Sequence, residues 1–150
     1  MHRLPAALLA GFLIAVALLP AATAAASPQE EAIDQLNQVR QANGLAALRG
    51  SDALERSSER YARQMIDTDY FGHASRIAVG SQFARAGETL ALHSGWTAKP
   101  EQTIGQWMNS PTHRAVLLSR GYRWVGMGIA RGRIGSRIVT VWVAHVGATR

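Results

Sequence analysis

The sequence predicts an α+β fold in which a small antiparallel sheet lies between helices. Apolar residues recur at helical spacing in the first half of the chain, whereas residues 125–130 and 138–146 are β-branched, apolar runs joined by a hairpin sequence at 131–136. Both faces of the last run are mostly apolar. We therefore expect helices to cover the sheet from above and from below.

The N-terminal segment has the pattern of a secretory signal. A positive end is followed by an apolar run over residues 4–19 and by small residues up to residue 26. We expect a signal peptide at 1–26, cleaved after Ala24 or after Ala26, and a single domain at 27–150. The mature protein would then be secreted, in an extracellular or periplasmic location. An uncleaved membrane anchor is the alternative, because the apolar stretch is long enough to cross a bilayer.

Capping signals predict where the first two helices begin. Residues 27–30 form a capping-box sequence with proline at the first helical position, and Asn43 with the following glycine ends that helix. Ser51 is the expected N-cap of a second helix, which should end between Thr68 and Tyr70.

The remaining elements are shorter. We expect helices at 100–107 and 111–118, with Ser110 as the N-cap of the second of these. Between them and the second helix, a short helix is expected around 81–85 and a short strand over 88–92.

Charge is unevenly distributed along the chain. Residues 102–150 contain seven Arg and no Asp or Glu, whereas residues 27–101 contain eight basic and ten acidic groups. Either the two parts interleave their charges in space, or the arginines form a basic face for an anionic envelope polymer or lipid. We expect no nucleic-acid partner, because the arginines lack interleaved aromatic residues. The chain has no cysteine, which excludes disulfides and thiol chemistry.

Three separate segments supply side chains with metal-binding or acid–base chemistry. They contribute His73, Glu88 and His113, at spacings that fit no single-helix metal motif. A shared site would therefore have to be assembled by tertiary folding. His113 is expected in the first turn of its helix, where the helix dipole favours the neutral imidazole that binds metals.

These segments stand in an order that is similar to a known family. They are Leu36–Arg40, Tyr61–Met65, Phe71-Gly72-His73, Gly87-Glu88-Thr89-Leu90-Ala91, Trp107–Arg114, Val125–Ile129 and Trp142-Val143. The chain resembles the CAP superfamily (cysteine-rich secretory protein, antigen 5 and pathogenesis-related 1), in its bacterial SCP-like extracellular form.

The resemblance implies a three-layer α-β-α sandwich with a cleft that holds two His and two Glu, and in some members the His pair binds zinc or another divalent cation. Matched residue by residue, it implies His73, Glu88 and His113 as the metal ligands. The second Glu has no counterpart in this chain, and Thr89 replaces the Asn of the family motif.

We expect a cleft that binds a divalent metal or a small ligand without turnover, because a hydrolytic zinc centre commonly needs a second carboxylate as base. A metal-dependent hydrolase of peptides or esters is the first alternative. A cell-envelope or lipid-binding adhesion module, based on the acid-free C-terminal third, is the second. A purely structural role, in which Glu88 and the histidines hydrogen-bond one another, also stays open. The sequence predicts no oligomeric state.

Other polar side chains are expected to have structural roles. A serine triad of Ser110, His113 and Glu88 is disfavoured, because Ser110 is better explained as a helix cap and no nucleophile elbow surrounds it. We expect His145 to be a core or sheet-edge residue, and His93 to lie in a surface loop, with a place at the cleft rim as the alternative.

Overall fold

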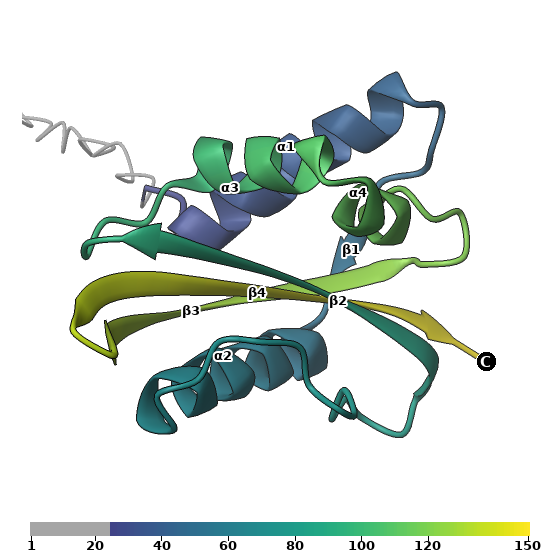
Figure 1. The fold of residues 1–150 in the computed structure, drawn as a ribbon. Coiled ribbons are helices and arrows are strands. Elements are labelled where there is room, and N and C mark those ends of the chain that lie inside the picture. The colour runs from purple at the N-terminus through teal and green to yellow at the C-terminus, as the bar shows by residue number, and fades with distance from the viewer. Residues whose placement is uncertain (1–24) are drawn as a thin grey trace, which may run out of the picture.

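A computed structural model describes residues 25–150 and shows a four-stranded sheet between two layers of helices (Figure 1). The α+β class and the α-β-α sandwich are therefore confirmed. The predicted signal segment falls almost entirely outside the described residues. Within residues 25–150, no helix is long and apolar enough to cross a membrane. In chain order the elements are α1 (Pro28–Ala42), β1 (Arg49–Gly50), α2 (Asp52–Asp67), β2 (Phe83–Ser94), α3 (Pro100–Asn109), α4 (Pro111–Leu117), β3 (Trp124–Ile134) and β4 (Arg137–Thr149).

The sheet has the strand order β1-β3-β4-β2. Its three long strands are antiparallel, as expected, and β3 and β4 form the predicted hairpin. The two-residue strand β1 was not predicted, and it pairs parallel to the start of β3. In the pairing of β2 with β4, Glu88 lies directly opposite His145.

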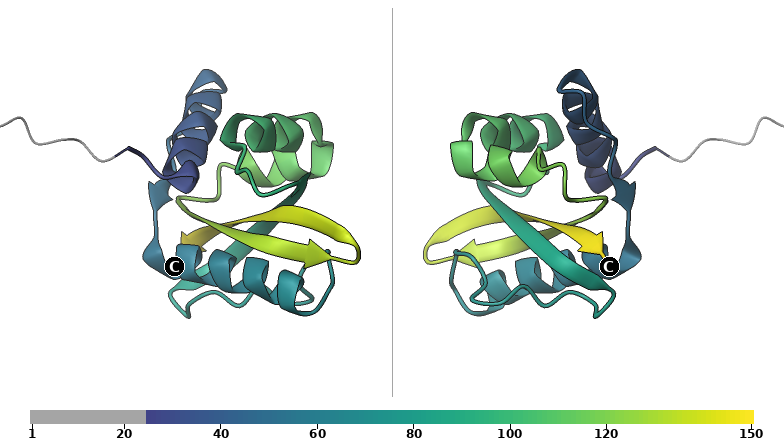
Figure 2. Two further views of the ribbon diagram at one scale, coloured as in Figure 1. Left: turned by 90° about the vertical axis from the view of Figure 1, so that its left-hand side faces the viewer. Right: turned by 90° about the vertical axis from the view of Figure 1, so that its right-hand side faces the viewer.

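Helices cover both faces of this sheet, as the apolar pattern of β4 requires. Helix α2 packs on one face, and α1, α3 and α4 pack on the other (Figures 1 and 2). Alternate residues of a strand point to opposite faces, so β4 contributes to both cores. Trp142, Ala144 and Val146 pack in the larger core. Val139, Val141 and Val143 pack in the α2 core, with Ala62 and Met65.

The cap signals of the first two helices are confirmed. Ser27 and Glu30 form both hydrogen bonds of the capping box, with distances of 2.7 and 3.2 Å. The side chain of Ser51 accepts a hydrogen bond from the backbone N–H of Leu54. Ser110 does precede α4, but its hydroxyl makes no cap hydrogen bond and instead pairs with the hydroxyl of Thr112 at 3.2 Å.

The prediction of a short helix around 81–85 is wrong. Strand β2 begins at Phe83 and pairs with the end of β4, with an irregular register between Phe83 and Arg85. A helix of one turn has few hydrogen bonds of its own. Pairing with Ala148 and Thr149 gives these backbone groups partners that the local sequence could not reveal.

Two glycines allow α2 to lie directly on the sheet. A Cβ atom on Gly126 would overlap the backbone of Leu54 and Glu55, and one on Gly128 would overlap the backbone of Ser58 and Glu59. The close approach lets the Ser58 hydroxyl, which is fully buried, donate to the Gly126 carbonyl at 2.9 Å.

We predict that Gly128→Ala destabilises the fold by about 1–3 kcal/mol, because an added methyl group would push α2 away from β3. Urea unfolding at neutral pH measures the change. Gly105→Ala is the matched control, because its Cβ would meet no atom within 4 Å and alanine is the better helix former. Equal midpoints for the wild type and Gly128→Ala would contradict the close contact.

Candidate functional site

The carboxylate of Glu88 is the centre of the polar site. It lies on β2, is 8% exposed, and accepts three hydrogen bonds. His73 Nδ1 lies 2.9 Å from Oε1, the backbone N–H of Ala74 donates to the same oxygen at 3.0 Å, and His145 Nε2 lies 3.0 Å from Oε2. A carboxylate can only accept, so the facing nitrogen of each ring carries the proton.

The three donors keep Glu88 ionised. Burial is the largest influence on its pKa and acts to raise it, but the hydrogen bonds from His145, His73 and Ala74 together outweigh burial. The net result is a pKa below the ordinary value of 4.5. Glu88 is therefore a buried anion at neutral pH whose charge is directed at two imidazole rings.

His113 lies beside His73. The two rings have centroids 6.0 Å apart and are tilted by 45°. His113 Nδ1 is buried and has no hydrogen-bond partner. Burial, and then the proximity of His73, lower the pKa of His113 below 6.5. The neutral ring predicted from its place in the helix is thus supported, although burial is the main physical cause.

The structure brings the predicted residues into one region, but their roles differ. Both oxygens of Glu88 already accept hydrogen bonds, and across residues 25–150 no group of three His, Asp or Glu is arranged to hold a metal ion. His113 Nδ1 makes no hydrogen bond, and His73 uses only Nδ1 in its bond to Glu88. The three-ligand set of His73, Glu88 and His113 stays a prediction.

His145 is the site residue that sequence reasoning missed. It is buried, as expected of a core residue, but both ring nitrogens belong to the polar network: Nε2 faces Glu88, and Nδ1 lies 2.7 Å from the hydroxyl of Ser57 on α2. The result is a continuous series of hydrogen bonds from Ser57 through His145 to Glu88. Ser110 forms no comparable series of hydrogen bonds with His113 and Glu88, because its hydroxyl pairs with the hydroxyl of Thr112.

The prediction of a surface loop for His93 is wrong. Strand β2 continues to Ser94, and His93 is 5% exposed under α3. Its Nε2 lies 2.8 Å from the hydroxyl of Thr103, which in turn donates to the Lys99 carbonyl. The His93 ring is therefore part of a contact between β2 and α3.

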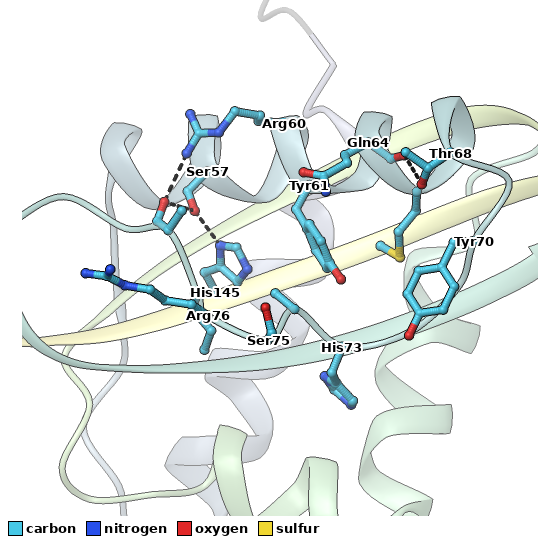
Figure 3. Close-up of a pocket in the computed structure, with 14 residues that line it drawn as sticks. Ser57, Arg60, Tyr61, Gln64, Thr68, Tyr70, His73, Ser75, Arg76 and His145 are labelled. Atoms are coloured by element: carbon cyan, nitrogen blue, oxygen red, sulfur yellow. Dashed lines mark hydrogen bonds between the residues drawn. The ribbon is translucent and has the colours of Figure 1, made fainter.

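A pocket of about 370 Å³ lies between α2 and the segment that leads from α2 to β2 (Figure 3). Ser57 and His145 line it, as do Tyr61 of α2 and His73 of the connecting segment. His73 therefore borders this pocket and also lies beside His113.

Six of the seven C-terminal arginines form two groups along the chain, one just before β3 and one around the β3–β4 turn. All seven are exposed, and none joins the ion pairs formed within residues 25–150. Direct pairing between the acidic and basic parts of the chain therefore does not balance their charge. A lipid, an anionic envelope polymer or a small molecule as partner stays a prediction. One group is Arg114, Arg120 and Arg123, the other is Arg131, Arg133 and Arg137, and Arg150 ends the chain.

Comparison with known proteins places most of the chain in one protein family. The profile of the cysteine-rich secretory protein family (CAP) matches residues 33–146. The uncharacterized protein YkwD of Bacillus subtilis (strain 168) is 28% identical over 109 residues, which are 67% of this chain and 41% of YkwD. This chain thus spans about two fifths of the length of that relative.

Two solved structures show the same fold at 21% identity. An outer surface protein from Borrelia burgdorferi matches with a TM-score of 0.62 over 79% of this chain and 90% of its own. An extracellular protein containing an SCP domain from Bacillus anthracis matches with a TM-score of 0.65 over 81% of this chain and 40% of its own.

We predict that Glu88→Gln lowers the free energy of unfolding by about 1–3 kcal/mol at pH 7, because a neutral amide presents one acceptor oxygen to three donors. The folded-state pKa of Glu88 is lowered, so its contribution is complete above 4.5 and is lost as the pH falls through the folded-state value. The difference between variant and wild type should therefore shrink in acid.

Urea unfolding from pH 7 to pH 3 measures this difference. Glu101→Gln is the control, because Glu101 is an exposed carboxylate in the first turn of α3. A difference that is independent of pH would show that the carboxylate charge of Glu88 does not stabilise the network.

Proposed function

Because this chain belongs to the cysteine-rich secretory protein (CAP) family, we propose that it is an exported domain whose cleft binds a divalent cation between His73 and His113, without turnover. The observation that carries the proposal is the Nδ1 atom of His113, which is buried beside His73 and has no hydrogen-bond partner. A buried polar atom without a partner costs free energy, and a bound cation would remove that cost.

Export is supported by two independent observations. The first 26 residues have the composition of a secretory signal. Proteins with the same fold include an outer surface protein and an extracellular protein. A location outside the cytoplasm also agrees with the lack of cysteine, since the fold is stabilised by packing and does not depend on the redox state of its surroundings.

Glu88 supports cation binding indirectly, through its hydrogen bond to the proposed ligand His73. Its hydrogen bond to His73 Nδ1 fixes the ring orientation and leaves the lone pair on Nε2. His113 is neutral at pH 7 because its pKa is lowered. Imidazole nitrogens are ligands that suit zinc and similar divalent ions. When bound, the cation would supply a positive charge to a ligand oxygen.

Binding without turnover follows from the acid–base groups present. Glu88 is held by three donors, so it is poorly placed to remove a proton from water. No second Asp or Glu joins its hydrogen-bond network in the described part of the chain. A two-imidazole site should also release its cation readily, since structural and catalytic zinc sites use three or four protein ligands.

We predict that zinc binds the wild type with measurable heat in calorimetry at pH 7, and that the double variant His73→Ala, His113→Ala loses this heat. The matched control is His93→Gln, which removes a buried imidazole outside the cleft and keeps a partner for Thr103. Equal heats from the wild type and the double variant would refute the cation site. Loss of binding in His93→Gln as well would show that the effect is on folding.

A further inference from the structure

We propose that the pocket between α2 and residues 68–78 is a binding site for a small organic anion, held by Arg60 and Arg76. This anion site is distinct from the cation cleft, because His113 is not among the residues that line the pocket. The proposal rests on the charge, the hydrogen-bond donors and the shape of the pocket.

The pocket carries positive charge without a matching carboxylate. Fourteen residues line it, including two arginines and two histidines, and none is Asp or Glu. Neither Arg60 nor Arg76 forms an ion pair in residues 25–150, where the single Arg–carboxylate pair joins Arg63 to Glu59 at 3.6 Å. A concave surface with charge of one sign concentrates ions of the opposite sign.

Nearby carboxylates do not pair with these arginines. Both oxygens of Glu88 accept hydrogen bonds from the imidazoles of His73 and His145 and from the backbone, and neither contacts Arg60 or Arg76. Asp69 accepts a hydrogen bond from the backbone N–H of Gly135 in the β3–β4 turn. Arg60 and Arg76 are therefore left to attract an anion from solution.

The donors of the pocket already converge on one oxygen atom. The carbonyl oxygen of Ala78 accepts a hydrogen bond from the Ser57 hydroxyl at 3.0 Å and another from Arg60 Nη2 at 2.9 Å. A guanidinium group has five N–H donors, and this is the one hydrogen bond that Arg60 makes within the described residues. Its other donors stay available for a carboxylate or phosphate, for which arginine has the matching geometry.

The walls of the pocket suit a ligand that also has an apolar body. Arg60 and Arg76 extend toward one end of the pocket in Figure 3, and the ring of Tyr70 stands at the other end, with Tyr61 between them. The volume of about 370 Å³ lies in the range of small-molecule sites. The ligand class is thus an oxyanion on an aromatic or aliphatic group, either a carboxylic acid or a phosphate monoester.

Titration of the wild-type protein with benzoate, phenyl phosphate and neutral benzamide, followed by amide NMR shifts at low salt, tests this proposal. We expect benzoate or phenyl phosphate to bind and to shift residues of α2 and of the 68–78 segment, and benzamide to bind about tenfold more weakly or not at all. Whichever of the two anions binds more tightly shows whether the natural ligand is a carboxylic acid or a phosphate monoester. Equal binding of benzamide, or no binding of either anion, overturns the proposal.

Variants locate the anion. Arg76→Gln should weaken binding about tenfold, and it carries little risk to folding because Arg76 is exposed and makes no hydrogen bond that the structure records. Arg60→Gln should weaken binding similarly. Arg63→Gln is the matched control, an exposed arginine of the same helix that does not line the pocket, and it should leave binding unchanged. Unchanged binding in both Arg60→Gln and Arg76→Gln overturns the assignment.

Two further measurements separate the anion site from the cation cleft. Binding of the anion should persist in His113→Ala and in the presence of a chelator, so loss of zinc binding would leave this result intact. Binding should also weaken as salt is added, because it depends on exposed guanidinium charge. Affinity that does not change with salt, or that disappears with the chelator, contradicts the proposed anion contact.

Discussion

The hydrogen bonds to Glu88 are the constraint on which the arrangement of the site depends. Burying a carboxylate costs several kcal/mol unless donors replace the lost water. Here the donors come from the segment after α2, through His73 and Ala74, and from β4, through His145. One buried anion therefore fixes a segment without regular structure against the sheet. That segment carries one imidazole of the cleft and forms one wall of the pocket.

The glycines of β3 connect this network to the fold. Because Gly126 and Gly128 let the α2 backbone touch the sheet, the short side chains of Ser57 and Ser58 can reach β4. Ser58 accepts a hydrogen bond from the backbone N–H of His145 at 3.1 Å, and Ser57 contacts the ring of the same residue. A larger separation between α2 and β3 would leave His145 with unpaired polar atoms in the interior.

Local signals predicted the parts of the fold that depend on few residues, such as the capping box at Ser27 and the N-cap Ser51. Strand β1, the first residues of β2 and the burial of His93 depend on partners distant in sequence, which no local pattern contains. The sequence predicts His145 as a core residue because it alternates with apolar residues along its strand. Its polar role follows only from the strand register, which places it opposite Glu88 and which no local pattern reveals.

The motif order predicted that His73, Glu88 and His113 belong to one region, but it could not predict how their lone pairs are used. Ala74 and His145 join His73 as donors to Glu88, so three of the about four acceptor positions of this carboxylate are used within the protein. Its carboxylate therefore contacts the two rings directly and does not line the pocket. A cation held between His73 and His113, as proposed, would be bound by imidazole nitrogens alone, whereas an anion in the pocket would be bound by the guanidinium charges of Arg60 and Arg76. His73 lines the pocket and is also one of the proposed cation ligands, so the two bound ions would attract each other, and any such coupling must be reciprocal.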